Sequence, residues 1–220
     1  GTYNLTNDEE HPYAPLVLGH KTVVNNAVIK SDIDCMIQNL EMTNSTLEIT
    51  TPSYASGAIS SRLASLSGDN LIFVNSKVKI DGYALDGISA NQQLILTGNT
   101  EVDIKALETG IVGPTVEITH SGGKIQATDP DRAIAAVAAV NNGFSSYSTP
   151  GKLTLTGTYL KEPAGGTVDI KIVRPSSVPQ DNAVPITTIL DGDAAAKTVV
   201  LEVEHKTHTW DAGKVTTEPT

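Results

Sequence analysis

Two tyrosines of this chain hold equivalent places, because Tyr54 and Tyr83 each stand five residues before an isoleucine that recurs in the sequence. Where successive turns of a chain stack, such a pair forms a column whose flat rings suit the apolar face of a sugar. Asp86 and Asn91 follow closely and supply polar partners for hydroxyl groups. These four residues are the candidate ligand-binding set. The alternative is an aromatic ladder that covers the protein's own sheet.

Two further carboxylates, Asp129 and Asp131, flank a proline next to Arg132. Carboxylate oxygens are the ligands that calcium prefers, so this pair is the candidate site for a weakly bound calcium ion. The competing interpretation is a turn in which Asp side chains cap the backbone and Pro sets φ. No other cofactor is expected.

Patterns typical of catalysis are weak. The chain has no G-x-S-x-G and no glycine-rich phosphate motif between a strand and a helix. Asp81 and Asp103, 22 residues apart, would stack as a carboxylate pair in adjacent turns, and Arg62 and Arg132 are the candidate bases of a polysaccharide lyase. Ordinary turn chemistry accounts for the same residues, so we expect a protein without enzymatic activity. A polysaccharide lyase or glycoside hydrolase remains the alternative.

The elements that position these residues must be strands. Thr, Val and Ile make up 63 of the 220 residues, and β-branched side chains suit strands better than helices. The net charge of −10 disfavours nucleic acid as a partner, no apolar stretch is long enough to cross a membrane, and a single cysteine excludes an internal disulfide.

One strand pattern recurs along the middle of the chain, with apolar residues at its first and third positions. Its copies occupy residues 40–49, 71–80, 94–104, 116–125 and 153–161, after a degenerate copy at 21–30. Four residues after each opening position stands a residue that tolerates a left-handed backbone at low cost. These residues are Asn25, Asn44, Asn75, Gly98, His120 and Gly157. We therefore expect a bend at each of them, followed by a second short strand.

A second motif lies between the copies and contains Ile59, Ile88, Ile111 and Ile134, at steps of 29, 23 and 23 residues. The strand motif steps by 19, 31, 23, 22 and 37 residues. A shared step near 22 predicts coils of a parallel β-helix that stack on one another, with loops extruded around 51–66 and 129–149. An antiparallel β-sandwich is the rival fold. For residues 133–140 a short helix and a strand remain equally open.

The predicted fold is thus all-β: a single-stranded parallel β-helix of about five to six coils with a C-terminal β cap. Residues 1–15 are expected to form an N-terminal arm or cap, 16–161 the β-helix, 162–205 the C-terminal cap or edge hairpin, and 206–220 a linker to a following module.

The run of coils over 16–161, with N-S-x-V/L turns alternating with G-I or A-I segments, resembles right-handed parallel β-helix domains of secreted bacterial surface proteins. That group includes carbohydrate-binding and adhesion modules. The tail HTWDAGKVTTEPT at 208–220 is similar to a repeat of large surface proteins of Gram-positive gut bacteria. These resemblances imply a secreted, cell-surface module within a longer chain.

We therefore expect a non-catalytic adhesion or glycan-recognition module, with an extracellular polysaccharide or host glycan and the neighbouring modules as partners. Nucleic-acid binding and membrane insertion are not expected. A purely structural spacer is the other alternative to an enzyme.

Overall fold

The computed structural model describes residues 1–6, 16–50, 64–82, 84–128, 132–141, 146–173 and 184–204. Within these ranges the chain forms strands and turns and contains no helix. The expected all-β class is confirmed, and residues 133–140 lie in a strand rather than in a helix.

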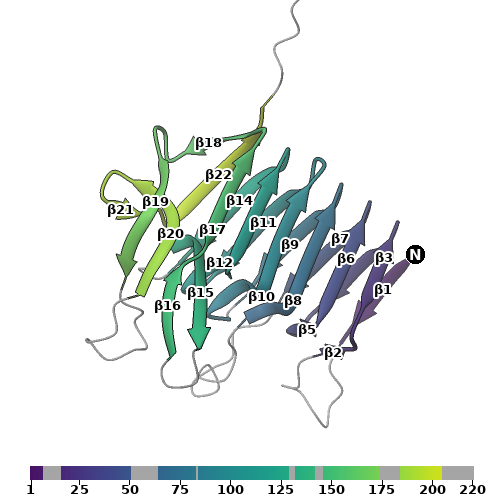
Figure 1. Cartoon of the computed structure of the whole chain (residues 1–220). Helices are drawn as coiled ribbons and strands as arrows, with labels where there is room; N and C mark the ends of the chain where they lie inside the picture. Colours follow the sequence, from purple (N-terminus) through teal and green to yellow (C-terminus); the bar gives the residue numbers. More distant parts are fainter. Residues whose placement is uncertain are drawn as a thin grey trace, which may run out of the picture.

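The strands form two long mixed sheets (Figure 1). The 8-stranded sheet contains, in order across it, β1 (Thr2–Leu5), β4 (Val28–Ser31), β7 (Thr46–Thr50), β9 (Lys77–Asp81), β11 (Glu101–Ala106), β14 (Gly122–Ala127), β22 (Thr198–Val203) and β18 (Thr158–Glu162). The 14-stranded sheet contains on its main path β19 (Thr167–Val173), β20 (Val184–Asp191), β15 (Arg132–Asn141), β12 (Thr109–Gly113), β10 (Asp86–Thr97), β8 (Ala64–Val74), β5 (Cys35–Ile37) and β2 (Leu16–Leu18). Off this path lie β3 (Thr22–Asn25), β6 (Asn39–Thr43), β13 (Thr115–Thr119), β16 (Ser146–Pro150), β17 (Lys152–Thr156) and β21 (Ala194–Ala195).

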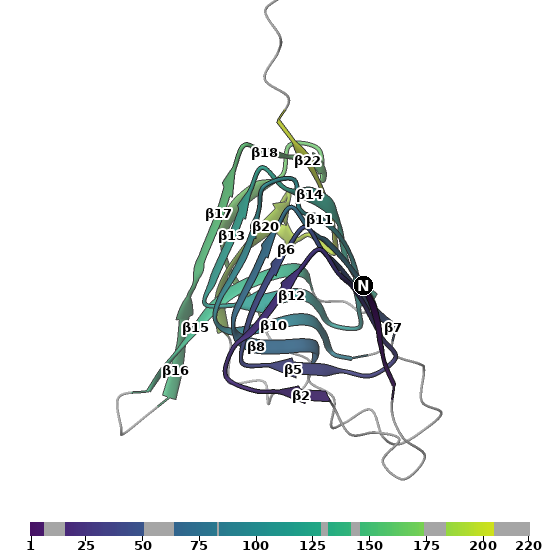
Figure 2. The ribbon, with the colours of Figure 1, turned by 90° about the vertical axis from the view of Figure 1, so that its right-hand side faces the viewer.

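Parallel pairing dominates both sheets. We use the word coil for the stretch of chain between one strand and the next strand that pairs with it in parallel. β3, β6, β8, β10, β13 and β17 form an unbroken series of parallel pairs, which we call the β3–β17 series. From β1 to β14 the 8-stranded sheet is parallel as well. Viewed along the stack, the strands lie on three sides (Figure 2). The antiparallel sandwich alternative is therefore wrong for this part of the chain.

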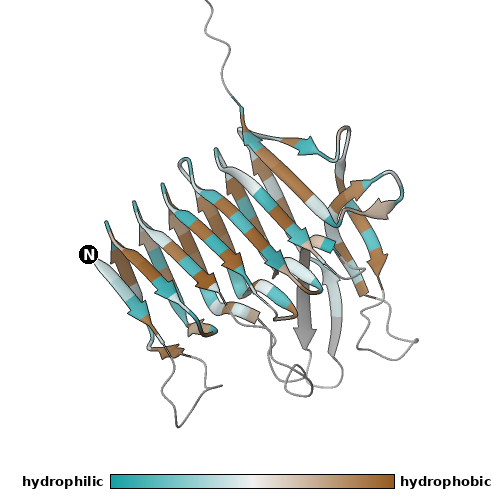
Figure 3. Ribbon diagram, turned by 180° about the vertical axis from the view of Figure 1, so that it is seen from behind, coloured by the Kyte–Doolittle hydropathy of each residue, from teal (hydrophilic) through white to brown (hydrophobic). Residues whose placement is uncertain are grey.

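Aliphatic columns explain why the coils stack. Leu71 pairs in register with Leu94, and Leu94 pairs with Val116, as the repeat predicts. All three side chains are fully buried. Apolar and polar bands alternate along the strands and line up from one strand to the next (Figure 3). Because one coil cannot bury its own apolar side chains, each coil depends on its neighbours for stability.

Left-handed corners recur where the sequence predicts them. Asn44, Asn75 and His120 have φ values of 49°, 48° and 45°, and Gly98 and Gly157 share this conformation. In the degenerate copy the corner is Asn26, with φ of 52°, rather than Asn25. The reason is a one-residue shift of register, because Thr22 and not Lys21 pairs with Leu40.

A ladder of buried hydroxyl groups follows these corners. The backbone N–H of Ser45 donates to Ser76 Oγ at 3.2 Å, and the N–H of Ser76 donates to Thr100 Oγ1 at 3.2 Å. Each hydroxyl donates in turn to a carbonyl of its own coil, Ser76 to Val74 at 2.8 Å. The N–H of Ser121 donates in the same way to Thr158 Oγ1 at 3.1 Å. The ladder satisfies backbone donors at corners that are closed to solvent.

Charged residues alternate in sign along one row of the 8-stranded sheet. The row runs through Lys30, Glu48, Lys79, Asp103 and Lys124, each in register with the next. Lys30 Nζ lies 2.8 Å from Glu48 Oε2, and this hydrogen bond holds the pKa of Glu48 below its ordinary value.

The expected stacking of Asp81 on Asp103 is wrong. Asp103 faces Lys79, and Asp81 faces Lys105, whose Nζ lies 3.7 Å from Asp81 Oδ1. Since opposite charges are favoured and like charges disfavoured across a strand pair, the two carboxylates are offset by two residues.

Two further expectations need correction. Ile59 lies outside the described residues, and the place next to Ile88 in its column is taken by Leu66. Within the region expected to form a loop at 129–149, β15 and β16 form an antiparallel pair. The described part of this insertion therefore forms the two strands of a hairpin, β15 and β16.

The two ends of the chain also pair with the stack. β1, within the segment expected to be an arm, pairs in parallel with β4. The last long strands of the described chain pair in antiparallel fashion: β22 pairs with β14 and β18, and β20 pairs with β15 and β19.

Candidate functional site

Four of the six residues proposed from the sequence lie outside the described residues: Tyr54, Tyr83, Asp129 and Asp131. The aromatic column and the calcium pair therefore stay predictions. Asp86 and Asn91 both lie in β10, but the structure does not place them in one site, because their partners lie on opposite neighbouring strands.

Asp86 begins β10 in register with Thr109 of β12, which in turn pairs with Arg132 of β15. Burial raises the pKa of the Asp86 carboxyl from 3.8 to about 7, the negative charge of Glu108 adds to this rise, and the Thr109 hydroxyl and the Arg132 charge oppose it. Thr109 and Arg132 are themselves buried. Asp86 thus belongs to a partly buried polar column that crosses three strands.

Asn91 belongs to a different and exposed group. Its amide donates to Asp69 Oδ1 at 3.0 Å, and Gln38 Nε2 donates to Asp69 Oδ2 at 3.3 Å. Further along, His20 Nδ1 lies 2.7 Å from Gln38 Oε1. One hydrogen-bonded row therefore crosses four successive coils.

A second row lies beside the first. Asn39 Nδ2 donates to the carbonyl of His20 at 2.7 Å, Asn70 Nδ2 donates to Asn39 Oδ1 at 2.7 Å, and Asn70 also reaches Gln92 Oε1 at 3.4 Å. We call the two rows together the amide corner. Its members are His20, Gln38, Asn39, Asp69, Asn70, Asn91 and Gln92.

Backbone geometry explains why these side chains meet. The chain turns within β8 at Gly68, where a Cβ atom would lie 2.0 Å from the carbonyl oxygen of Ile37, so only glycine fits. Asp69 and Asn70 then donate their N–H groups to the carbonyl of Gln38 at 2.7 and 3.2 Å. In three successive coils a pair of polar residues faces this corner: Gln38–Asn39, Asp69–Asn70 and Asn91–Gln92.

The sequence analysis missed this corner, although a signal is present. Gln38–Asn39 and Asp69–Asn70 stand directly before the apolar openings Leu40 and Leu71, and in the next copy the polar run Asn91–Gln93 precedes Leu94. The recurring strand motif begins at its apolar opening residue and so does not include the polar residues in front of it.

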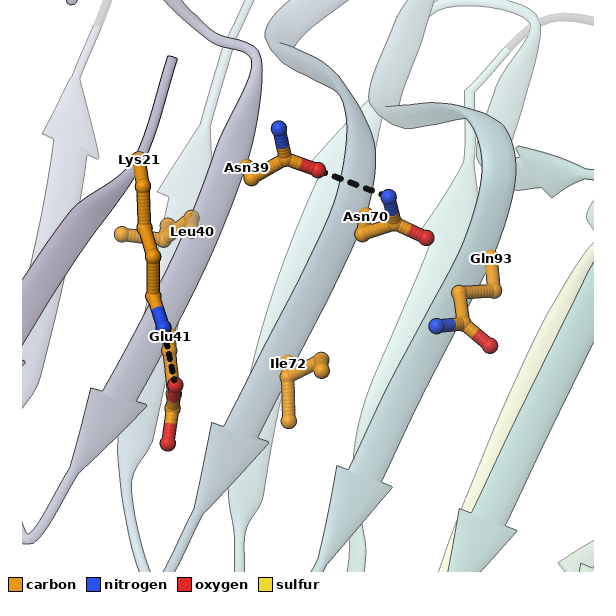
Figure 4. A pocket seen from close by; sticks show the side chains of 7 residues that line it. All are labelled: Lys21, Asn39, Leu40, Glu41, Asn70, Ile72 and Gln93. Carbon is orange, nitrogen blue, oxygen red and sulfur yellow. Dashed lines mark hydrogen bonds and ion pairs between the residues drawn. The ribbon is translucent and has the colours of Figure 1, made fainter. Parts of the chain in front are cut away.

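A shallow depression of about 360 Å³ adjoins the amide corner, on the outer side of the β3–β17 series. Asn39, Asn70 and Gln93 line it from three successive strands, with Ile72 beside them (Figure 4). Lys21, Leu40 and Glu41 complete the lining. Asn39 pairs in register with Asn70, and Asn70 pairs with Gln93, so the three amides form a row across the strands.

This lining suits recognition by hydrogen bonds better than it suits acid–base chemistry. Each amide offers both donors and an acceptor, which matches the hydroxyl groups of a sugar. Ile72 and its in-register neighbour Ile95 are partly buried and form an aliphatic strip next to the amides. Glu41, the single carboxylate among the seven lining residues, lies 3.6 Å from Lys21 Nζ.

Within the described residues, no group of three or more His, Cys, Asp or Glu side chains is arranged to hold a metal ion. The same part of the chain contains no helix of the length and apolarity needed to span a membrane. No family model, curated protein or solved structure matches this chain.

Proposed function

We propose that this chain is a non-catalytic module of a secreted bacterial surface protein, a right-handed parallel β-helix that recognises glycans at the cell surface through the depression beside the amide corner. The observation that carries the proposal is the row of three amides next to an aliphatic strip on an outward sheet face. The location at a bacterial surface and the role in adhesion are proposed from the sequence resemblances.

The aliphatic strip and the amides have complementary tasks. Sugar rings present C–H faces that pack on apolar side chains and hydroxyl groups that exchange hydrogen bonds with planar polar side chains. Because the amides of Asn39 and Asn70 are held by their hydrogen bond at 2.7 Å, little conformational entropy is lost when a ligand binds.

Of the residues considered for catalysis, Arg62 lies outside the described residues, and the others support an enzyme less well. Arg132, considered as a base, is buried at the start of β15, and Asp81 and Asp103 each face a lysine. A substrate proton or glycosidic oxygen has to reach such groups directly.

The proposal is tested by binding of the protein to a glycan array and to insoluble polysaccharides, using the wild type and the double variant Asn39→Ala/Asn70→Ala. We expect binding by the wild type and a clear loss in the double variant. Gln126→Ala, which truncates an amide on the 8-stranded sheet, is the matched control and should bind as the wild type does.

Two outcomes would contradict the proposal. If the wild type binds no glycan, the structural spacer becomes the favoured function. If the protein releases unsaturated sugars from pectin or alginate, it is a lyase. Circular dichroism spectra and unfolding midpoints of all variants separate a loss of binding from a loss of fold.

A further inference from the structure

The charges around the depression narrow the class of glycan. This inference rests on the proposed function and adds to it. Two lysines of this sheet face each contact a carboxylate. Lys21 Nζ, in the lining of the depression, lies 3.6 Å from Glu41 Oε2. Lys152 lies two strands beyond Gln93 in the same row, and its Nζ lies 3.3 Å from Glu117 Oε1. Each lysine therefore already has a carboxylate partner, with which an anionic ligand would have to compete.

An acidic glycan would find an unfavourable surface here. Recognition of a carboxylate or sulfate requires cations that are available for charge-assisted hydrogen bonds. The chain carries a net charge of −10, so its overall field repels polyanions as well. Neutral amides, in contrast, lose little when they exchange water for hydroxyl groups.

The row of amides runs across the strands, and a polysaccharide chain that contacts all three amides has to lie in the same direction. Asn39, Asn70 and Gln93 occupy three strands that pair in register, so the row runs across the strands at a spacing of about 4.8 Å. This spacing is close to the length that one sugar unit occupies in an extended chain. Ile72 and Ile95 repeat with the same spacing alongside.

We propose that the depression binds a neutral polysaccharide whose chain lies across the strands of the β3–β17 series, with about one sugar unit for each coil. Sugar hydroxyl groups meet the amides of Asn39, Asn70 and Gln93, and ring faces pack on Ile72 and Ile95. Anionic substituents are disfavoured, because Glu41 and Glu117 already pair with the two lysines and repel a further negative charge.

The experiment compares a neutral panel (cellulose, mannan, galactan and starch) with an acidic panel (polygalacturonate, alginate and heparan sulfate). We expect a neutral polysaccharide to bind, with an affinity that changes less than about twofold between low and high salt, because no ion pair forms with the ligand. Oligosaccharides of the bound type should gain affinity with each added unit until the chain covers the three strands of the amide row. Asn39→Ala/Asn70→Ala should weaken binding about tenfold, because two hydrogen-bonding groups are lost.

A charge variant gives an independent readout. Glu117→Gln removes the partner of Lys152 outside the lining of the depression and should raise binding to the acidic panel several-fold, while binding to the neutral ligand changes less than about twofold. Glu48→Gln, which also removes the carboxylate partner of a lysine but on the 8-stranded sheet, is the control and should change neither.

The outcomes separate the two proposals. Binding of acidic polysaccharides alone, or binding that falls steeply with salt, overturns this inference and leaves glycan recognition standing. Affinity that is independent of oligosaccharide length overturns the placement of the ligand across the strands. Absence of binding to both panels overturns the proposed function itself.

Discussion

Replacement of Asp86 by Asn should make the stability of the protein less dependent on pH. The folded-state pKa of Asp86 is raised to about 7 by burial, from an ordinary value of 3.8. Between about pH 4 and pH 7 the folded protein therefore holds a proton that the unfolded chain has released. Because the folded state binds more protons in this window, Asp86 makes the protein less stable as pH rises toward 7. Its effect is constant above and below the window.

The magnitude follows from the difference between the two pKa values. At about 1.4 kcal/mol for each pH unit, about three units give an upper limit of about 4 kcal/mol. Asp86 is only partly buried, so water relaxes part of this cost, and we expect about 2 kcal/mol. Asn is neutral and still accepts a hydrogen bond from Thr109. Asp86→Asn should thus match the wild type near pH 4 and exceed its stability by about 2 kcal/mol at pH 8.

The assay is urea-induced unfolding of both proteins at pH 4, 5.5 and 8, followed by circular dichroism. Asp103→Asn makes the same change in net charge at a carboxylate of the alternating row and serves as the control. A gap between Asp86→Asn and the wild type that stays constant with pH would refute the reasoning. A variant less stable than the wild type at pH 8 would refute it as well.

Two further predictions concern the corners and the small residues of the stack. Ser76→Ala removes the acceptor of the buried Ser45 N–H and should lower the free energy of unfolding by about 1–3 kcal/mol. Ser76→Thr keeps a hydroxyl group, as Thr100 does at the equivalent place of the next coil, and should lower the free energy of unfolding by less than about 1 kcal/mol. Both values are measured by urea unfolding, and equal costs for the two variants would argue against the ladder. Gly110→Ala places a Cβ 2.3 Å from Ile125 Cγ2 and 2.7 Å from the Ala133 carbonyl oxygen, so it should cost about 1–3 kcal/mol. Gly19→Ala meets nothing within 4 Å and should shift the thermal midpoint little; similar shifts for both glycine variants would contradict the packing argument.

The aliphatic columns could be predicted because two simple requirements act together. Leu71, Leu94 and Val116 open strands with apolar alternation, and each is followed by a residue that tolerates positive φ. Burial and backbone sterics both leave their mark on residue type, so the pattern is visible in the sequence.

The two errors in the repeat arose where burial and backbone sterics do not distinguish between neighbouring residues or between chain lengths. In the degenerate copy Asn25 and Asn26 are adjacent and either one suits a left-handed corner, so the sequence left the register open by one residue. Leu66 replaces Ile59 as the neighbour of Ile88 because the chain between two coils has no fixed length, and motif spacing alone does not locate the insertion.

The site was harder to predict than the core. Gln38, Asn70 and Asn91 are polar residues of types that are common in the exposed connections of any protein. They are distinguished only by their hydrogen bonds at one corner of the stack. That meeting depends on the close approach at Gly68, which no local pattern reports. Asp86 looked like a surface partner in the sequence, but the structure places it in contact with Thr109.

Charges alternate in sign from Lys30 to Lys124, one residue for each coil. Coils can therefore be added or removed without bringing like charges together only two at a time. Removal of the coil that holds Lys79 would set Glu48 against Asp103, while removal of two coils would again place an acid beside a base. Each exposed pair is worth well under about 1 kcal/mol, but the contributions of a whole row add. Arrays engineered to be longer or shorter should therefore assemble best when their length changes in even steps.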